Sequence, residues 1–459
     1  MVTRVRERLP GEPNQSQDEA LRMHSFYRGK IEIMPKCVIR GFDDLAIWYT
    51  PGVAKPCTAI KEDQDAVYEY TNKCNTVAIV TDGTRVLGLG DIGPEAGLPV
   101  MEGKALLFKY LGGVDAVPIC LDTKNPEEVI AAVKWLKPSF GAVNLEDISQ
   151  PKCFAILDTL RKELDIPVWH DDQQGTATVA LAGLISALKI VNKRIGEIKF
   201  ALIGCGAAGM ATARLAFASG LKPENTIVVD SKGILHCERT DIEERKLEYA
   251  DKWRLCLTTN PEGRKGGIAE AMTRADVCIS FSKPGPGVID GEWVRGMQSG
   301  AIVFACANPT PEIWPWEAHE AGAMIVATGR SDFPNQLNNA LVFPGLFRGV
   351  LDVRAKTITD EMCLAAAKEI ADYAEHQGLS EDHIVPAMDD FLVTAHVAAA
   401  VGMKAQEQGI ARIHSSRNEL FRQAAAVIRR SRAAMAILVE RGVISNPDVE
   451  TSSEVIATA

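Results

Sequence analysis

The 459-residue chain lacks several features that mark specialised classes of protein. It has no run of 18 or more apolar residues, so we expect no membrane-spanning helix and no membrane partner. The N-terminal stretch MVTRVRERLPGEPNQSQDEA has no apolar segment of the kind that a secretory signal needs. The net charge of −10 argues against a nucleic-acid partner, because nucleic acids bind basic surfaces. We therefore expect a cytoplasmic protein that acts on small molecules.

The spacing of the cysteines also shows no pattern of disulfide pairing. The eleven cysteines are irregularly spaced and contain no C-x-x-C pair. An odd, scattered set is typical of reduced cytosolic thiols rather than of a disulfide framework. Apolar residues make up 46% of the chain and charged residues 24%, which is the balance of a soluble globular protein. A chain of this length is too long for one core and predicts two or three domains.

Short apolar runs alternate with helical patterns along two parts of the chain. In the first part, strands are predicted at 75–83, 115–122, 140–147 and 167–172, and helices at 100–112, 125–137, 150–164 and 175–194. In the second part, strands are predicted after residue 197 and at 226–230, 276–282, 301–308 and 324–329. Such alternation indicates parallel βαβ units, so the predicted fold class is α/β, with an N-terminal parallel α/β domain and a Rossmann-type doubly wound domain. From about residue 338 the pattern is mostly helical, and 415–442 is predicted to be one long helix.

A glycine motif marks the start of the second part. Gly204, Gly206 and Gly209 have the spacing G-x-G-x-x-G between a predicted strand and a predicted helix. This context favours a dinucleotide-binding turn, where the backbone approaches a pyrophosphate and the helix N-terminus offers N–H groups. The expected cofactor-binding residues of the turn are Gly204, Gly206, Ala207, Ala208 and Gly209. A glycine-rich turn that only packs a helix on a strand is the alternative.

The residue at the end of the next predicted strand bears on the choice of cofactor. Asp230 occupies the position from which an acidic side chain binds a ribose 2′-hydroxyl, which favours NAD. Ser231 and Lys232 follow directly, and a lysine there could receive a 2′-phosphate. NAD is therefore the expected cofactor and NADP the alternative.

Two acidic pairs follow predicted strands of the first part. Glu146-Asp147 ends FGAVNLED, and Asp171-Asp172 ends IPVWHDD. Because the carboxyl ends of parallel strands form the ligand crevice, four carboxylates would converge there and repel one another unless a cation joined them. Oxygen ligands favour Mg²⁺ or Mn²⁺, and His170 beside the second pair is either a ligand or a packing residue. The alternative is that both pairs lie in solvated loops.

Lys104 lies in the helical stretch LPVMEGKALLFKYLGG on the same face as Met101, Phe108 and Leu111. Such a lysine either extends to water or is held partly desolvated, which lowers its pKa and makes it usable as a general base. Nearby acids would shift the pKa upward, so both directions remain open. Tyr49 precedes a turn at Pro51 and is either a half-buried aromatic residue or a weak acid that donates a proton.

Together these residues resemble the malic enzyme family, the oxaloacetate-decarboxylating malate dehydrogenases. The matching stretches are YTPGVA, GTRVLGLGDIGPEAGLPVMEGKALLFKYLGGVDAVPI, VNLEDI, PVWHDDQQGTATVALAG, FACANPTPEI and ATGRSDFPNQLNNALVFPG. They occur in the family's order over about residues 25 to 350, and the chain length is similar to that of the compact bacterial-type form. The resemblance implies oxidative decarboxylation of L-malate to pyruvate and CO₂, with reduction of NAD(P) and a divalent metal, Mn²⁺ or Mg²⁺.

The resemblance also implies roles for single residues. Tyr49 corresponds to the proton donor, Lys104 to the general base and a substrate contact, and Asp171 to the catalytic partner of Lys104. The implied metal ligands are Glu146, Asp147 and Asp172, the further substrate contacts are Arg85, Asn308 and Asn339, and the nicotinamide contacts are Asn308 and Asn338. The implied regions are a flexible arm at 1–22, a substrate and metal domain at 23–180, an NAD(P) domain at 181–355 and a helical region at 356–459. A homodimer or higher homo-oligomer is expected on the same ground.

Four positions depart from the usual pattern of the compact form. Arg85 and Asp91 stand where alanine and asparagine are common, Gln174 replaces a frequent histidine, and Trp48 replaces a small residue. These departures bear on substrate range and rate more than on the type of reaction. Two other functions stay open: a malolactic conversion of malate with tightly bound NAD, and a non-catalytic dinucleotide-binding regulatory protein. The second would be expected to lack Tyr49, Lys104 or a ligand carboxylate, and all of these are present.

Overall fold

The computed structural model describes the backbone of residues 15–447, with side chains from residue 19 onward. The described residues form two compact units, one of residues 39–432 and one of residues 15–38 with 433–447. The smaller unit contains helix α1 (Gln15–Tyr27), where the Tyr27 hydroxyl donates to the Ser445 carbonyl at 2.7 Å. Part of the predicted flexible arm over 1–22 is helical from Gln15, because the last proline and glycine of this stretch precede that residue and a run of helix-forming residues begins. Residues 1–14 lie outside the described residues.

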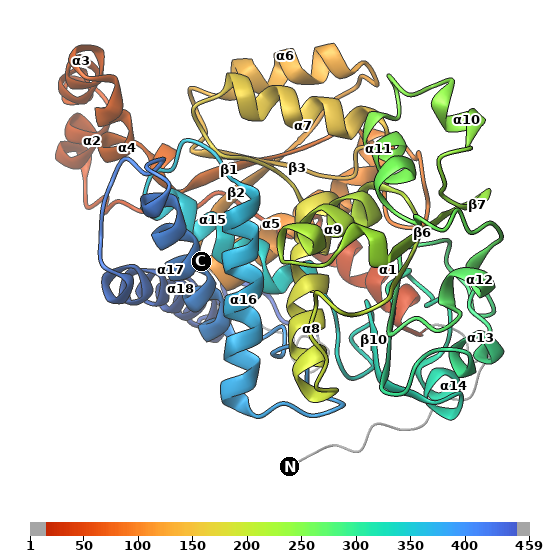
Figure 1. Ribbon diagram of the computed structural model, residues 1–459. Helices are drawn as coiled ribbons and strands as arrows, with labels where there is room; N and C mark the ends of the chain where they lie inside the picture. The colour runs from red at the N-terminus through yellow and green to blue at the C-terminus, as the bar shows by residue number, and fades with distance from the viewer. Residues whose placement is uncertain (1–14, 448–459) are drawn as a thin grey trace. The chain divides into compact units, whose positions relative to one another are not determined.

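The first sheet of the larger unit is parallel, with the strand order β2-β1-β3-β4 (Figure 1). Its strands are β1 (Thr76–Thr81), β2 (Asp115–Cys120), β3 (Ala142–Leu145) and β4 (Val168–His170). Helices α6 (Pro126–Leu136) and α7 (Lys152–Glu163) cover one face, and α5 (Pro94–Gly112) packs on the other. Because both faces are covered, β1, β3 and β4 are buried runs rather than alternating ones, whereas the edge strand β2 is only half-buried.

The second sheet has the order β10-β9-β8-β5-β6-β7 and confirms the predicted doubly wound fold. Its strands are β5 (Phe200–Ile203), β6 (Thr226–Asp230), β7 (Gly233–Ile234), β8 (Val277–Ser280), β9 (Ala301–Ala305) and β10 (Ala323–Thr328). All pairs are parallel except β6 with the short β7. The strand order reverses between β5 and β8, which is the position where doubly wound sheets bind ligands. Helix α9 (Ala207–Ala218) follows β5.

The helix α8 (Thr176–Ile190) joins the two sheets and is buried along most of its length. It packs against α9 and against α16 (Asp360–Gln377), and the expected boundary at residue 180 falls inside it. Helices α15 (Phe343–Asp352) and α17 (Phe391–Glu407) pack on each other and on α5. The Phe108 ring lies 4.6 Å from that of Phe343 and 5.0 Å from that of Phe347. The C-terminal helices thus complete the core beneath the first sheet.

The remaining elements are short or peripheral. They are α2 (Phe42–Trp48), α3 (Ala54–Glu62), α4 (Val67–Tyr70), α10 (Thr240–Glu243), α11 (Ala250–Thr258), α12 (Ile268–Met272), α13 (Gly291–Arg295), α14 (Pro315–Glu320) and α18 (Arg417–Glu440), together with single 3₁₀ turns at Gln64–Ala66, Asn72–Asn75, Pro223–Asn225 and Asn339–Leu341. Within residues 15–447, none of the helices is both long and apolar enough to cross a bilayer.

Candidate active site

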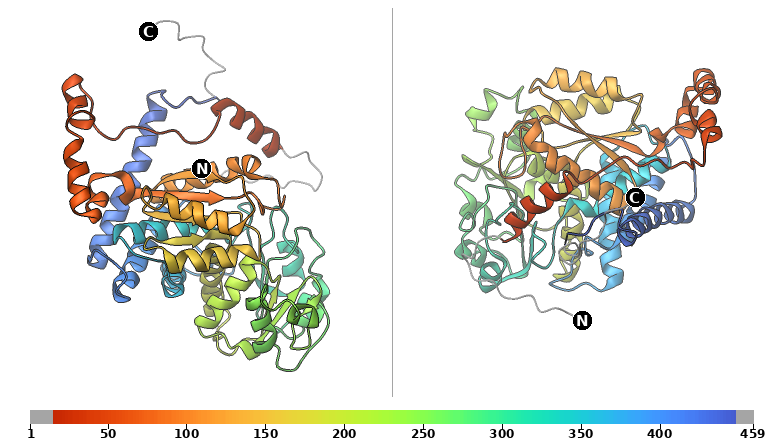
Figure 2. Two further views of the ribbon diagram at one scale, coloured as in Figure 1. Left: turned by 90° about the horizontal axis from the view of Figure 1, so that it is seen from above. Right: turned by 180° about the vertical axis from the view of Figure 1, so that it is seen from behind.

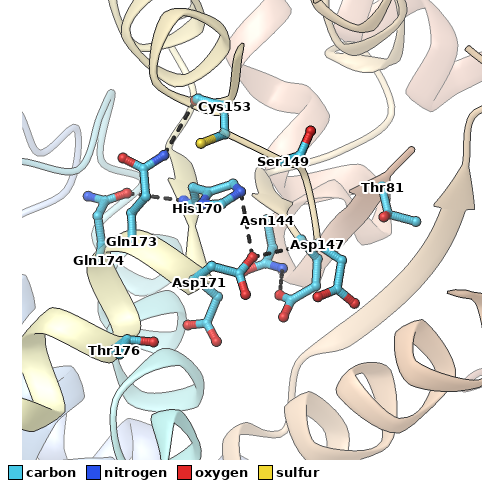
Figure 3. Close-up of polar contacts among 12 residues, drawn as sticks. Thr81, Asn144, Asp147, Ser149, Cys153, His170, Asp171, Gln173, Gln174 and Thr176 are labelled. Carbon is cyan, nitrogen blue, oxygen red and sulfur yellow. Dashed lines mark hydrogen bonds and ion pairs between the residues drawn. The ribbon is translucent and has the colours of Figure 1, made fainter. Parts of the chain in front are cut away.

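The carboxyl edge of the first sheet gathers the two predicted acidic pairs, and Figure 3 shows Asp147 and Asp171 there. Glu146 and Asp147 directly follow β3, and Asp171 and Asp172 directly follow β4. The register pairs Leu145 with His170, so the two acidic pairs leave the sheet side by side. The sequence prediction that both pairs end neighbouring parallel strands is therefore confirmed, and the alternative of two unrelated solvated loops is wrong.

Three of the four acids form a compact oxygen cluster. Glu146, Asp147 and Asp172 each offer a carboxylate oxygen, and these oxygens lie within 4.8 Å of one another. Burial raises the pKa of Asp147 to about 8, with the neighbouring Asp172 adding to the shift, and burial likewise raises the pKa of Glu146 well above its usual range. The buried Oδ2 of Asp147 has no hydrogen-bond partner in the described part of the chain.

Crowded carboxylates with an unsatisfied oxygen are what a divalent cation neutralises. Oxygen-only ligands of this kind fit Mg²⁺ or Mn²⁺, as the sequence suggested. His170 is fully buried beside the cluster, with its Nε2 at 3.6 Å from Asp172 Oδ2. It does not belong to the cluster of oxygens, so the structure favours its reading as a packing residue.

Asp171 points away from the cluster and into a polar network of its own. Its Oδ2 accepts hydrogen bonds from Lys104 Nζ at 2.6 Å and from Asn339 Nδ2 at 2.8 Å. Its Oδ1 accepts from Trp169 Nε1 at 3.0 Å, and the side chain is fully buried. The two adjacent acids therefore differ in their surroundings: the Asp171 side chain is fully buried, whereas the Asp172 side chain is 33% exposed.

Lys104 lies between the network and the oxygen cluster. Its ammonium is 2.6 Å from Asp171, 3.0 Å from Glu146 Oε1 and 4.4 Å from the centre of the Phe343 ring. Burial by itself lowers the pKa of Lys104, but the two carboxylates outweigh it and raise the pKa above its usual value. The sequence left open whether the pKa of Lys104 is lowered or raised, and in the structure it is raised.

The loop after β1 carries Arg85 to the same edge. The Arg85 backbone N–H donates to the Asp147 carbonyl at 2.9 Å, and the Arg85 side chain is exposed. Gly88 in this loop approaches the second sheet so closely that a Cβ there would lie 3.0 Å from the carbonyl oxygen of Asn308. The Arg85 loop therefore meets the loop after β9, and the carboxyl edges of the two sheets face a shared space.

Three asparagines come from loops at the edge of the second sheet. Asn339 reaches the Asp171 network, as described above. Asn308 follows β9, with its side chain against Gly329, and Glu312 fixes this loop because its buried carboxylate accepts from the Ala307 N–H at 3.0 Å. Asn338 Oδ1 accepts from the Ala340 N–H at 2.9 Å and so caps the 3₁₀ turn. The roles of Asn308, Asn338 and Asn339 in binding stay predictions.

The glycine turn has the conformation that its motif predicts. Gly204 has a φ of +97°, and a Cβ on Gly209 would lie 2.0 Å from the Gly204 carbonyl oxygen. Residues Ala207 and Ala208 open α9, so the backbone N–H groups of the helix start face the carboxyl edge of the sheet. Ile203 of β5 pairs with Val229 of β6, and Asp230, the last residue of β6, follows Val229. Asp230 therefore lies next to the glycine turn.

Tyr49 is the predicted catalytic residue that the structure does not bring to the site. It follows α2 and is 75% exposed. Helices α2 and α3 lie at one margin of their unit, away from α8 and α9, in all views (Figures 1 and 2). No hydrogen bond or ion pair within residues 15–447 joins Tyr49 to Lys104.

Some residues of the site were missed in the sequence. Trp169 donates a hydrogen bond to the Asp171 carboxylate. The sequence could have indicated this contact, because residues two apart along a strand lie on the same side of it. Lys152 lies 2.5 Å from Asp82, whose Oδ1 accepts from the Thr84 hydroxyl at 2.6 Å, and this network supports the Arg85 loop. Nothing in the local sequence pairs Lys152 with Asp82, because Lys152 begins α7 and Asp82 follows β1, 70 residues earlier in the chain.

Comparisons with known proteins give a consistent result. Two family descriptions match, "Malic enzyme, N-terminal domain" over residues 28–161 and "Malic enzyme, NAD binding domain" over residues 173–406. The NAD-dependent malic enzyme of Geobacillus stearothermophilus is 52% identical over 84% of this chain and 78% of its own. The bifunctional malic/malolactic enzyme of Bacillus subtilis is 48% identical over 86% of this chain and 95% of its own.

Solved structures agree with these relatives. The chain superimposes on the malic enzyme of Entamoeba histolytica with a TM-score of 0.91, at 47% identity, over 95% of this chain and 93% of the other. The malic enzyme of Pyrococcus horikoshii superimposes with a TM-score of 0.89, at 50% identity, over 93% of this chain and 99% of the other. An NADP-dependent malic enzyme of Rhizobium meliloti is 43% identical over 86% of this chain but 52% of its own length.

Proposed function

This chain belongs to the malic enzyme family, and we propose that the carboxyl edge of its first sheet is where it oxidises and decarboxylates L-malate. It is an NAD(P)-dependent enzyme of this family, and its products are pyruvate, CO₂ and the reduced coenzyme. The observation that carries the assignment of the site is the convergence of Glu146, Asp147 and Asp172 beside the Lys104–Asp171 pair.

Glu146, Asp147 and Asp172 would hold the Mn²⁺ or Mg²⁺ ion. Their mutual repulsion, the unsatisfied Asp147 Oδ2 and the oxygen-only ligand set all fit such an ion. When bound, the ion supplies Lewis-acid polarisation of the substrate oxygen at C2. The three ligands lie only one or two residues beyond the ends of β3 and β4, so a rigid sheet edge carries them rather than a long loop.

Lys104 would accept the proton of the C2 hydroxyl, and a bound nicotinamide would supply the acceptor for the hydride from C2. To accept this proton its amine must first be neutral, and the two carboxylates now disfavour the neutral form. Glu146 would share its negative charge with a bound cation, which would leave less of it to stabilise the Lys104 ammonium. Asp171 positions the amine, because its own carboxylate is held in place by Trp169 and Asn339.

Arg85 is proposed to hold a carboxylate of the substrate. A guanidinium binds a carboxylate through two parallel hydrogen bonds and thereby orients it. The backbone bond from the Arg85 N–H to the Asp147 carbonyl keeps the loop beside the proposed metal ligands. Asn308 and Asn339 would contact the substrate, and Asn308 and Asn338 the nicotinamide, since the three follow strands or turns at the same edge.

Tyr49 is proposed to protonate C3 of the enol of pyruvate, in the site of a second copy of the chain. Tyr49 is 75% exposed and follows α2, which lies at the margin of its unit. The site of the same chain therefore lacks this tyrosine. The exposed Phe42, Ile47 and Trp48 on α2 form an apolar surface of the kind that marks a protein interface. The enzyme is thus proposed to work as a homodimer or higher homo-oligomer.

The regions and the compartment are proposed on the same basis. Residues 23–180 would bind the substrate and metal, 181–355 the coenzyme, and the helices of 356–459 would complete the core. All eleven cysteines are free thiols, which is consistent with a reducing compartment such as the cytoplasm.

A coupled assay tests the proposed function. Purified enzyme is stripped with EDTA and given L-malate with NAD or NADP, with and without Mn²⁺, while absorbance at 340 nm and pyruvate are followed in parallel. We expect reduced coenzyme and pyruvate in equal amounts, only with the metal. Metal-independent turnover, or no turnover with either coenzyme, would contradict the proposal.

A malolactic conversion is the second candidate, because the Bacillus subtilis relative is described as bifunctional. In that reaction the hydride returns to pyruvate, so lactate accumulates and NADH does not. The same assay distinguishes the two reactions when lactate is measured beside pyruvate.

A further inference from the structure

The side-chain amide of Asn335 holds separate segments of the chain together. Its Nδ2 donates to the Val326 carbonyl at 3.0 Å and to the Glu381 carbonyl at 2.7 Å. Its Oδ1 accepts from the Ile384 N–H at 2.9 Å. Asn335 is only 6% exposed, so water barely reaches these three hydrogen bonds. The amide thereby joins β10 to the loop that follows α16.

The backbone of Asn335 explains why an asparagine suits this position. Its φ is +56°, in the left-handed region that favours glycine and asparagine. Glycine would adopt this conformation but would make no side-chain hydrogen bond. Aspartate has a similar shape, but its carboxylate cannot donate to two carbonyl oxygens. The asparagine amide combines the conformation with two donors and one acceptor.

The segment that follows Asn335 is fixed at each step on its way to the active site. Gln336 forms a bridge with Thr328, and the Leu337 N–H donates to the Thr328 carbonyl at 2.8 Å. Leu337 packs against α8 at Gly183, where a Cβ would lie 2.9 Å from Leu337 Cδ2. The course of this segment therefore depends on the position from which it starts.

The segment ends at the proposed catalytic network. Asn339 Nδ2 donates to Asp171 Oδ2 at 2.8 Å, and the same oxygen accepts from Lys104 Nζ at 2.6 Å. Only three residues lie between Asn335 and Asn339. A shift of the backbone at Asn335 would therefore be carried to Asn339 and to the carboxylate that it contacts.

We propose that Asn335 is a positioning residue of the reaction, which holds Asn339 in place against the Asp171–Lys104 pair. This inference rests on the proposed function, in which Asn339 contacts the substrate. Asn335 acts through Asn339, because its own side-chain hydrogen bonds all go to backbone groups of the same chain. A misplacement of about 1 Å at a reacting group can lower a rate by about 100-fold, so this clamp serves the rate as well as the stability.

The experiment compares Asn335→Gly with the wild type at saturating coenzyme and Mn²⁺. Glycine keeps the left-handed backbone and removes the three side-chain bonds. We expect kcat/KM for malate to fall by about tenfold or more, with KM for malate raised by about threefold or more. The inhibition constant of ADP-ribose, which lacks the nicotinamide, should change by less than about twofold. A purely structural residue would lower the unfolding temperature and leave these constants of the folded enzyme unchanged.

Asn260 offers a matched control. It has a φ of +52° and is 5% exposed, and its amide donates to the carbonyls of Leu235 and Arg264 and accepts from the Arg264 N–H. Its backbone N–H donates to the carbonyl of Thr226, which begins β6, so it lies at the end of the sheet opposite the carboxyl edge. Asn260→Gly should destabilise the protein to a similar degree but change kcat/KM for malate by less than about twofold.

A double-mutant cycle tests whether Asn335 acts through Asn339. When Asn339 is already replaced by alanine, Asn335→Gly should lower kcat/KM by less than about threefold, because the group that Asn335 positions is missing. Equal losses with and without the Asn339 side chain would overturn the proposal. An equal kinetic loss in Asn260→Gly would overturn it as well, since the effect would then not depend on the place of the asparagine.

The outcomes separate this inference from the proposed function. Wild-type kinetics in folded Asn335→Gly overturn the positioning role and leave the proposed function intact. Failure of the wild type to oxidise malate overturns the proposed function and this inference with it. Thermal unfolding shows whether each variant is folded at the assay temperature. If Asn335→Gly does not fold, Asn335→Asp replaces it, because aspartate keeps the acceptor for the Ile384 N–H and loses both donors.

Discussion

Asp171 and Asp172 show how two adjacent acids acquire different tasks from their surroundings. Asp171 is fully buried and bonded to Lys104, Trp169 and Asn339, so it serves as a fixed anchor. Asp172 is one third exposed and shares the oxygen cluster with Glu146 and Asp147. The difference arises because the two side chains leave the π-helical turn after β4 in different directions.

Asp147→Asn tests the oxygen cluster at the level of one residue. Its folded-state pKa of about 8 exceeds the ordinary 3.8, so the folded metal-free protein binds more protons than the unfolded chain between these values. Stability of the metal-free wild type should therefore fall as pH rises from about 4 to about 8. At pH 8 in EDTA, Asp147→Asn should unfold at a higher temperature than the wild type and should gain little from Mn²⁺.

The measurement is thermal unfolding in EDTA and in Mn²⁺ at several pH values. The exposed Asp122, replaced by asparagine, serves as the control and should leave both the pH profile and the response to Mn²⁺ unchanged. A variant that is less stable than the wild type in EDTA at pH 8, yet fully stabilised by Mn²⁺, would contradict the assignment of Asp147 as a ligand.

The turn between β4 and α8 determines where the second acidic pair points. The sequence predicted a strand through Asp172, but β4 ends at His170 and a single π-helical turn covers Asp171–Gly175. The His170 N–H donates to Gln174 Oε1 at 3.1 Å, so a side chain of the turn replaces the next strand partner. Strand propensity alone does not indicate such a competition, because it depends on a side chain that folds back.

Gly175→Ala tests this element. A Cβ at Gly175 would lie 2.0 Å from Asp171 Oδ1, and the three partners of Asp171 leave the carboxylate little freedom to move. We expect a loss of about 1–3 kcal/mol in the free energy of unfolding and a marked loss of malate oxidation. Gly103→Ala in α5 is the matched control, since no atom lies within 4 Å of its Cβ position.

Chemical denaturation and steady-state rates of both alanine variants provide the comparison. Gly103→Ala should be neutral or more stable by up to about 1 kcal/mol, because alanine favours the helix. If Gly175→Ala were as stable and as active as Gly103→Ala, the close packing of the turn around Asp171 would not be needed for the site.

At the scale of the whole molecule, loops at the carboxyl edges of the two sheets meet. The Arg85 loop of the first sheet approaches the Asn308 carbonyl of the second, and helix α8 connects the sheets behind this contact. The site does not include Tyr49, which remains exposed on its own chain.

Mixing two inactive variants tests whether Tyr49 acts across a dimer. Tyr49→Phe and Lys104→Ala should each release little pyruvate from malate on their own. When co-expressed in equal amounts with different affinity tags, they should recover about a quarter of the wild-type rate, because each heterodimer contains one site with both residues intact. Purification through both tags isolates these heterodimers.

Recovery that depends on both variants would support catalysis in trans. If doubly tagged heterodimers form and remain as inactive as the single variants, Tyr49 acts within its own chain or has no catalytic role. If the protein elutes as a monomer that is fully active, the proposed oligomer is not required.

The sequence by itself determined the alternation of strands and helices, the glycine turn and the acids that end β3 and β4. These depend on local patterns and on the chemistry of residues close together in the chain, which act before any long-range contact forms. The strand 226–230 was predicted at its observed bounds for this reason, while helix α1 was missed because the prolines and charges preceding it dominated the interpretation.

Only the tertiary structure decided the direction of the Lys104 pKa shift, the anchoring of Asp171 and the exposure of Tyr49. Lys104 and Asp171 are 67 residues apart in sequence, and the electrostatic effect of one on the other depends on the 2.6 Å between them. The pairing of Asp230 with Arg239 and Lys252 likewise depends on where two helices return to the sheet. Distances of this kind are set by the packing of the whole chain, since charge interactions fall with separation in space rather than with separation in sequence.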